Sequence, residues 1–446
     1  MGSALDTIFA LSTGPGRGAI AVIRLSGPKA GESLTLLSGR PLGAARQAIV
    51  RALRHPRTGE ALDQALTLYF PAPSSFTGED MAELHVHGGR AVIAGVLESL
   101  SEIEGLRPAE PGEFARRAFD QGRLDLVAAE GLADLIAAET GAQRRQALGQ
   151  MGGALGALYD GWRAGIIEVM ALAEAGLDFS DQDLPAGLEE KIKRGIDRLV
   201  AALSAHLDDG RRGELVRDGL EIAILGPPNA GKSSLLNAIA RRDVAIVAAT
   251  AGTTRDVVEI RLDLGGYPVL LADTAGLREA TDEIEAEGIK RALARAERAD
   301  LKLIVLDGAT WPTIDPKAEA LIDSKAMIIL NKADLLAAAA PRSVQGIPIE
   351  PVSCITGSGL DGLIARLATE AAKLMAEAAS PALTQIRHRR ALEEARAALQ
   401  RARDATGVEL CAEDLRLAAR ALGRITGRVD VEDVLGEVFR SFCIGK

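Results

Sequence analysis

The sequence predicts a multidomain fold in which two α/β parts are combined with an all-α part. Around residues 1–120 and 218–380, short apolar runs rich in β-branched residues alternate with helical patterns, as in α/β folds. Regions 121–217 and 381–446 instead repeat Ala, Leu and Ile at three-to-four-residue spacing, which predicts helices. A chain of 446 residues, 47% of them hydrophobic, is long enough for about three domains with sizeable cores.

These patterns also predict the order of the domains. Residues 1–120 form an N-terminal α/β domain, 121–217 and 381–446 form the two parts of one helical domain, and 218–380 form a second α/β domain inserted between those parts. A domain with both ends anchored in one rigid body can transmit a conformational change to that body. The insertion therefore predicts that a conformational change in the inserted domain is transmitted to the helical domain.

Composition narrows the class of protein. The net charge of −10 argues against a general nucleic-acid binder, so any RNA contact must use a local patch or a partner's surface. Three scattered cysteines predict no disulfide framework and fit a reducing cytoplasm. The sequence shows neither a leader pattern nor an apolar run of about 20 residues. We therefore expect a cytoplasmic protein without a membrane span.

In the N-terminal domain, the Gly-rich segment Thr13–Gly18 separates two predicted strands. It has the composition of an anion-binding nest, but an ordinary loop is favoured because no helix follows it. His85 and His87 share one face of a strand, as metal ligands can, but a third ligand is not apparent. Arg24 and Glu83 lie within predicted strands, where surface charge is the ordinary interpretation. The predicted elements are strands Thr7–Leu11, Ala19–Leu25, Leu66–Phe70 and Met81–Val86, and helix Ala91–Leu100.

Residues Gly226–Ser233 (G-P-P-N-A-G-K-S) form a complete phosphate-binding loop between a predicted strand, Glu221–Leu225, and a predicted helix. In such a loop, backbone N–H groups converge on phosphate oxygens and the helix N-terminus adds partial positive charge. Lys232 is expected to reach the β- and γ-phosphates, and Ser233 to bind Mg²⁺. A Gly- and Pro-rich turn before a helix is the less favoured alternative.

Three further motifs follow in order, each at the end of a predicted strand. Asp273-Thr-Ala-Gly276 places a carboxylate on the Mg²⁺ side. Asn331-Lys-Ala-Asp334 offers a carboxylate that accepts both hydrogens of guanine N1 and N2, a donor pair that adenine lacks. Ser353-Cys354 lies where a loop amide meets guanine O6. Each motif alone also occurs in ordinary turns, but the ordered set indicates a guanine nucleotide site. It resembles that of the translation-factor-like class of P-loop GTPases.

Hydrolysis requires a group that orients the attacking water. In Ras-type enzymes this group is a Gln directly after the D-T-A-G motif, but here that position is Leu277, which cannot orient water. An arginine finger is not obvious in the sequence either. Thr254 suits a switch threonine on Mg²⁺. A monovalent cation beside Asn229 would replace the finger by preorganised electrostatics. Alternatively, Asn229 caps its own turn. Spacing leaves the choice among the carboxylates of Asp282–Glu285 open. The predicted GTP-binding residues are Asn229, Ala230, Gly231, Lys232, Ser233, Ser234, Thr250, Ala251, Gly252, Thr253, Thr254, Asp273, Thr274, Ala275, Gly276, Asn331, Lys332, Asp334, Ser353 and Cys354.

The helical regions contain one strongly basic segment, Arg387–Asp404. It is the best local candidate for contacts with RNA phosphates, yet Glu393 and Glu394 fit an ordinary exposed helix at least as well. The chain ends with a helical pattern over Asp414–Phe442 and the tail Cys443–Lys446.

Over its whole length the chain resembles the MnmE (TrmE) family of tRNA modification GTPases. The ending Phe442–Lys446 (F-C-I-G-K) is close to unique to that family. The other matching motifs are Gly14–Gly18, Ser75–Asp80, His87–Gly89, Pro111–Phe119, Ala251–Asp256 and Asp273–Glu279.

The resemblance implies addition of a carboxymethylaminomethyl or aminomethyl group to C5 of the wobble uridine of certain tRNAs. It implies a heterotetramer with a FAD-binding protein of the MnmG (GidA) type, and a one-carbon unit from 5-formyl- or 5,10-methylene-tetrahydrofolate. The N-terminal domain holds the folate and forms the homodimer. For Cys443 a catalytic part is one interpretation; a buried small residue is favoured because no activating base is identifiable nearby in sequence. The implied folate contacts are Arg24, Glu83, Arg123 (often Lys in the family) and Lys446.

The same resemblance implies how GTP is hydrolysed. The implied Mg²⁺ ligands are Ser233 and Thr254, and the implied water-orienting carboxylate is that of Glu285. Potassium joins the GTPase domains of a dimer and replaces the arginine finger. Its implied ligands are Asn229 and the carbonyls of Ala248, Thr250 and Thr253.

Two other classes of GTPase are alternatives. A ribosome-assembly or RNA-chaperone GTPase usually carries an RNA-binding module such as a KH domain, and we find no G-x-x-G loop in a basic setting. A membrane-remodelling GTPase is disfavoured by the acidic balance and by the lack of a basic amphipathic or apolar anchor.

Overall fold

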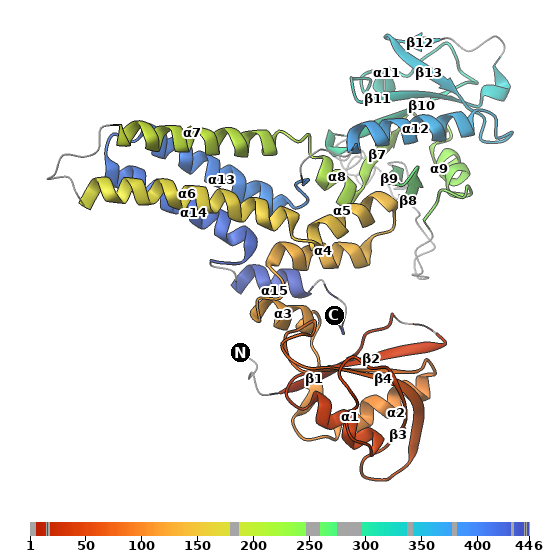
Figure 1. Ribbon diagram of the computed structural model, residues 1–446. Helices are drawn as coiled ribbons and strands as arrows, with labels where there is room; N and C mark the ends of the chain where they lie inside the picture. Colours follow the sequence, from red (N-terminus) through yellow and green to blue (C-terminus); the bar gives the residue numbers. More distant parts are fainter. Residues whose placement is uncertain are drawn as a thin grey trace, which may run out of the picture. The chain divides into compact units, whose positions relative to one another are not determined.

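The computed structural model describes residues 6–14, 16, 18–178, 187–246, 259–273, 297–336, 342–376, 381–429, 432–440, 442 and 444–445. Both sheets and long helices are present, so the predicted combination of α/β and all-α parts is confirmed (Figure 1). The chain forms two compact units, each built from several segments. The first contains Met1–Ala133, Gln150–Ala171 and Leu415–Lys446, and the second contains Asp134–Gly149 and Leu172–Asp414.

Within the described residues, the first unit has a sheet of strand order β3-β4-β5-β2-β1-β6. Its neighbouring strands are antiparallel except for the parallel pair β1 and β6. Helices α1 (Ala30–Ser38) and α2 (Arg90–Ser101) cover one face, where Leu37 and Leu100 are fully buried in the core. The strands are β1 (Thr7–Leu11), β2 (Ile20–Ser26), β3 (Ile49–Arg54), β4 (Ala61–Phe70), β5 (Met81–His87) and β6 (Leu106–Pro108).

The strands and the helix predicted in this region are confirmed, whereas α1, β3 and β6 were not predicted. The β3 segment I-V-R-A-L-R alternates apolar and charged residues only weakly, and β6 is three residues long. After the sheet come α3 (Glu113–Asp120) and α4 (Leu126–Ala137). Their apolar side chains share a cluster with Phe439 of α15 (Glu432–Arg440). The C-terminal helix thus packs on the helices that follow the N-terminal sheet.

The second unit contains a sheet of order β12-β13-β11-β10-β7-β9-β8 within the described residues. Helices α9 (Lys232–Ala240) and α12 (Leu360–Met375) pack on one face, and the short α11 (Pro316–Glu319) on the other. The strands with a predicted counterpart are β7 (Leu220–Leu225), β9 (Tyr267–Asp273), β11 (Ala326–Asn331) and β13 (Ile347–Pro351); the others are β8 (Glu259–Leu264), β10 (Leu301–Asp307) and β12 (Ser343–Val344). Strands covered on both faces read as apolar runs, which is why most were visible in the sequence.

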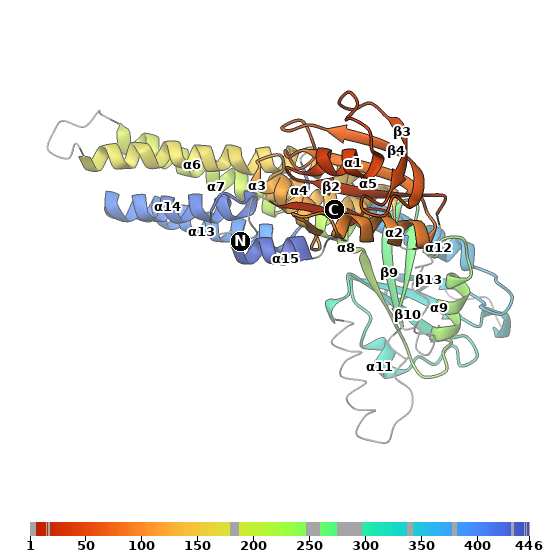
Figure 2. The ribbon, with the colours of Figure 1, turned by 90° about the horizontal axis from the view of Figure 1, so that it is seen from below.

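The remaining helices confirm the helical pattern on both sides of this sheet region. Helices α7 and α13 of the second unit lie side by side (Figures 1 and 2), and Arg403 of α13 pairs with Asp197 of α7 at 2.7 Å. In the described part of the chain, no helix combines the length and apolar character needed to cross a membrane. The helices are α5 (Gly141–Met151), α6 (Ala154–Asp178), α7 (Leu188–Leu207), α8 (Arg212–Asp218), α13 (Ile386–Asp404) and α14 (Val408–Thr426).

Candidate functional site

Parallel strands bring the sequence motifs to one edge of the second sheet. β7 pairs in parallel with β9 and β10, β10 with β11, and β11 with β13. Their carboxyl ends therefore share an edge, where β7 leads into Gly226, β9 ends at Asp273 and β11 at Asn331. Strands are added on both sides of β7, and α/β sheets bind ligands at such a switch in strand order.

The loop after β7 has a backbone that requires glycine at two positions. Gly226 has φ 144°, and a Cβ there would collide with the Val305 carbonyl oxygen. Gly231 has φ 91° and leads directly into α9, which no side chain of the described residues caps. The N-terminus of α9 thus follows the loop directly, an arrangement that suits the binding of an anion.

Lys232 and Ser233, the first residues of α9, supply the cation and the hydroxyl. Lys232 is only 8% exposed, and its Nζ donates to the carbonyl oxygens of Gly226 (2.9 Å) and Pro227 (2.8 Å). Ser233 Oγ donates to Oδ2 of the buried Asp273 at 2.6 Å. Hydroxyl and carboxylate oxygens are hard ligands, so this pair fits a Mg²⁺ ion that is also held by substrate phosphates.

Asn331 connects the loops at this edge. Its Nδ2 donates to the Ala230 carbonyl oxygen at 2.8 Å, and its Oδ1 accepts from Cys354 Sγ at 3.2 Å. Its backbone carbonyl accepts from Gly308 N at 2.7 Å. One residue thus contacts the loops after β7, β10 and β13.

The neighbouring residues complete the base-side loops. Asp334 accepts a hydrogen bond from Ser353 Oγ at 2.6 Å, which brings together two motifs predicted for guanine. Lys332 adopts a left-handed conformation (φ 59°), and its Nζ lies 2.7 Å from Oδ2 of Asp307 at the end of β10. Asp307 was not predicted. The apolar run L-K-L-I-V-L before it resembles the run that identified Asp273, and this signal could have found it.

Ser234, which was also predicted to bind the nucleotide, is an exposed residue of α9. Part of the predicted site lies outside the described residues. The predicted positions outside the described residues are Ala248, Thr250, Ala251, Gly252, Thr253, Thr254, Thr274, Ala275, Gly276, Glu285, Cys443 and Lys446.

In the first unit, Arg24 and Glu83 form a pair on the sheet face opposite α1 and α2. They are direct partners in the β2–β5 register, and Arg24 Nη2 lies 2.9 Å from Glu83 Oε1. Their side chains are 23% and 17% exposed, so the interpretation as ordinary surface charges is wrong. His85 Nε2 lies 3.2 Å from the other carboxylate oxygen, and the Arg24 guanidinium lies 5.8 Å from the Phe76 ring centroid. The sequence could not show this because pairing across strands joins residues 59 positions apart.

The described part of the tail lies against the same sheet. Ile444 forms a backbone bridge with Pro111, and Ser12 Oγ donates to the Gly445 carbonyl oxygen at 2.9 Å. Gly445 has φ 95°, and a Cβ there would collide with the Leu11 carbonyl oxygen. Arg123, the third implied folate contact, is exposed after α3 and packs its stem near Gly78.

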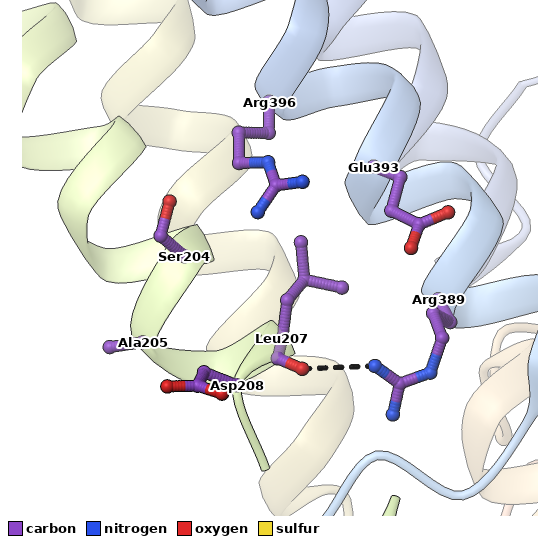
Figure 3. A pocket seen from close by; sticks show the side chains of 7 residues that line it. All are labelled: Ser204, Ala205, Leu207, Asp208, Arg389, Glu393 and Arg396. Carbon is purple, nitrogen blue, oxygen red and sulfur yellow. Dashed lines mark hydrogen bonds between the residues drawn. The ribbon is translucent and has the colours of Figure 1, made fainter. Parts of the chain in front are cut away.

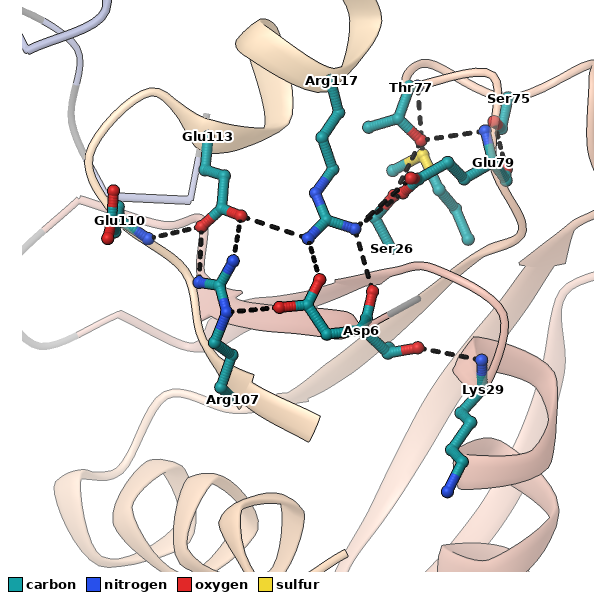
Figure 4. A network of polar contacts seen from close by, with 12 residues as sticks. Asp6, Ser26, Lys29, Ser75, Thr77, Glu79, Arg107, Glu110, Glu113 and Arg117 are labelled. Atoms are coloured by element: carbon teal, nitrogen blue, oxygen red, sulfur yellow. Dashed lines mark hydrogen bonds and ion pairs between the residues drawn. The ribbon is translucent and has the colours of Figure 1, made fainter. Parts of the chain in front are cut away.

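Two family-like motifs of the first unit form an ion network (Figure 4). The Asp6 carboxylate lies 2.6 Å from Arg107 Nε and 2.7 Å from Arg117 Nη2. Arg117 also pairs with Glu79 at 3.1 Å, and both arginines pair with Glu113. Burial alone raises the pKa of Glu113, but the hydrogen bonds from Arg107, Glu110 N and Arg117 outweigh it, so its pKa is lowered. Glu79 of the Ser75–Asp80 motif is thus paired with Arg117 of the Pro111–Phe119 motif, and Glu113 of that motif with both arginines.

Three arginines of the basic helix α13, Arg389, Arg401 and Arg403, form ion pairs within the second unit. A groove of about 480 Å³ between α7 and α13 is lined by Arg389 and Arg396 but also by Asp208 and Glu393 (Figure 3). Arg389 donates to the Leu207 carbonyl oxygen and pairs with two carboxylates, those of Asp209 and Glu214, at 2.7 Å each. Because acidic and basic side chains both line this groove, the interpretation of α13 as an ordinary helix is favoured over its interpretation as an RNA phosphate-binding surface.

Comparisons with known proteins give matches over almost the whole chain. A family model described as the GTP-binding protein TrmE N-terminus matches residues 7–123, and one described as the MnmE helical domain matches residues 126–443. A Rhodospirillum rubrum protein named tRNA modification GTPase MnmE is 56% identical over 457 residues, covering 99% of this chain and 100% of the relative. Proteins of the same name from Parvibaculum lavamentivorans and Caulobacter vibrioides are 55% identical over 446 residues and 54% over 449, with the same coverage.

Proposed function

The chain belongs to the MnmE (TrmE) family of tRNA modification GTPases, and on this premise we propose a specific reaction for it. Together with a FAD-binding partner of the MnmG type, it adds a carboxymethylaminomethyl or aminomethyl group to C5 of the wobble uridine of certain tRNAs. Lys232, Asp273 and Asn331 meet at a single sheet edge, and this observation supports the binding of a guanine nucleotide there.

We assign GTP to the loops at that edge. Lys232 neutralises the phosphates, and Asp334 accepts the hydrogen bonds of guanine. Mg²⁺ is held by Ser233 and Thr254 with Asp273 behind Ser233, a role that the 2.6 Å contact supports. Glu285 orients the attacking water. When bound, potassium supplies the positive charge that an arginine finger gives to other GTPases. The proposed potassium ligands are Asn229, Ala248, Thr250 and Thr253.

We assign a tetrahydrofolate to the open face of the first sheet, with Arg24, Glu83, Arg123 and Lys446 as its contacts. The Arg24–Glu83 pair is half-buried and lies beside an aromatic ring, which suits a flat, charged ligand. The tail supports the assignment, because Gly445 lies against Leu11 and the adjacent Ala10 is the register partner of Arg24. The folate donates the one-carbon unit when bound.

The proposed assembly is a homodimer made by the N-terminal domain, joined to the MnmG-type protein as a heterotetramer in the cytoplasm. Dimerisation of the GTPase domains activates hydrolysis. The proposed domains remain residues 1–120, 121–217 with 381–446, and 218–380.

The decisive experiment is mass spectrometry of tRNA nucleosides from cells that lack this protein. We expect the C5-modified wobble uridines to disappear and to return with the wild-type chain but not with Ser233→Ala. The exposed α7 variant Lys193→Gln is the matched control and is expected to restore modification. Unchanged wobble uridines in the deletion strain would contradict the proposed reaction.

A further inference from the structure

Cys354 carries a side-chain contact that the proposed roles do not use. Its Sγ lies 3.2 Å from Asn331 Oδ1, and Asn331 is 2% exposed. The other end of the Asn331 amide faces the Ala230 carbonyl oxygen, which only accepts hydrogen bonds. That end must therefore be the NH₂ group, so the end that faces Cys354 is the oxygen. The thiol is consequently the donor of this contact.

The protonation of the thiol agrees with that role. Burial, together with the nearby Asp334 carboxylate, raises the pKa of Cys354 above its usual value even though Asn331 opposes the shift. At neutral pH the group is therefore S–H, which can donate. The contacts then run from the loop after β13, through Asn331, to the phosphate-binding loop after β7, past the intervening strand β10.

We propose that the Cys354 thiol is a positioning residue that fixes the Asn331 amide and thereby joins the base-binding loop to the phosphate-binding loop. The inference rests on the proposed guanine nucleotide site. The thiol touches no atom that reacts, so it affects how tightly the nucleotide is bound and leaves the chemical step alone.

The test compares Cys354→Ala, which removes the donor, with Cys354→Ser, which keeps one. We expect Cys354→Ala to raise the Kd for GDP about 3- to 10-fold, and Cys354→Ser to stay within about 2-fold of the wild type. KM for GTP is expected to rise in Cys354→Ala with kcat unchanged. Cys411→Ala, at a buried cysteine of α14, is the control for loss of a thiol and is expected to bind GDP like the wild type.

Each other outcome has a defined meaning. Wild-type affinity in Cys354→Ala overturns the inference. Equal losses in Cys354→Ala and Cys354→Ser also overturn it, because they would assign the effect to packing instead of the hydrogen bond. If the wild-type chain itself does not bind GDP, the proposed nucleotide site fails, which is distinguishable from failure of the inference alone. Circular dichroism spectra and melting curves of the nucleotide-free variants verify that each is folded.

Discussion

The two sheets present their candidate ligand-binding residues in different ways. In the second unit these residues lie at or just after the ends of parallel strands, where Asp273 and Asn331 are the last strand residues. In the first unit Arg24 and Glu83 lie in the middle of two antiparallel strands. A strand-end motif has a local meaning, because its backbone and side chains act together over a few residues. A mid-strand charge acquires its partner only from the register of a distant strand.

The motifs of the two units also differ in what they do. The strand-end motifs of the second unit face one candidate site, whereas Glu79, Glu113 and Arg117 of the first unit are used within an ion network. A motif that resembles a family is therefore not by itself a binding site. Substitutions in the two units can distinguish function carried by loops from function carried by strands.

The largest effect is expected for Lys232→Ala. Removing the buried ammonium takes away the positive charge that we assign to the phosphates, so kcat/KM for GTP is expected to fall about 100- to 1,000-fold. Steady-state GTP hydrolysis measures it, with Lys193→Ala on the exposed face of α7 as the control. A variant that keeps hydrolysis within about 3-fold of the wild type would remove Lys232 from the site.

The corresponding loss in the first unit is expected for Arg24→Ala. A hydrogen bond to a charged group contributes about 1.5–3 kcal/mol, so the Kd for 5-formyl-tetrahydrofolate is expected to rise about 10-fold or more. Calorimetric titration measures it, and GTP hydrolysis is expected to stay unchanged. Arg54→Ala, at an exposed end of β3 in the same sheet, is the matched control. Equal folate affinity in Arg24→Ala and the wild type would exclude Arg24 as a folate contact.

A salt comparison tests the loop-borne site without a mutation. If potassium neutralises the phosphates in place of an arginine finger, GTP hydrolysis is expected to be severalfold faster in KCl than in NaCl at equal ionic strength and Mg²⁺. Equal rates in both salts would exclude the cation mechanism. Potassium is expected to have no effect on folate affinity.

The smallest effect concerns the ion network. The pKa values of Asp6 and Glu113 are lowered in the folded chain from ordinary values of 3.8 and 4.5. Their stabilisation is therefore fully present above about pH 4.5, and it is lost as the pH falls through the lowered folded pKa values. We expect the protection factors of the α3 amides, which correct for the intrinsic exchange rate at each pH, to fall on acidification below that pH. Glu113→Gln is expected to accelerate exchange already at neutral pH and to flatten this dependence, and an unchanged profile in that variant would contradict the assignment.

Much of the second sheet could be predicted, because its buried parallel strands are apolar runs that end in recognisable motifs. Asp307 was missed even though its strand carries the same signal. The side-chain contact between Cys354 and Asn331 could not be predicted, since it joins residues 23 positions apart on different loops. The Arg24–Glu83 pair, the ion network and the position of Gly445 against Leu11 were equally hidden.

The sequence by itself determined the domain classes, the strand-end motifs, the guanine nucleotide and the family, because backbone conformation and short motifs depend on residues that are close along the chain. Only the tertiary structure decided which charges are partners, which motif residues hold the fold and which side chain orients Asn331. The physical reason is that these interactions depend on distances between atoms of remote segments, and those distances are set by strand register and packing.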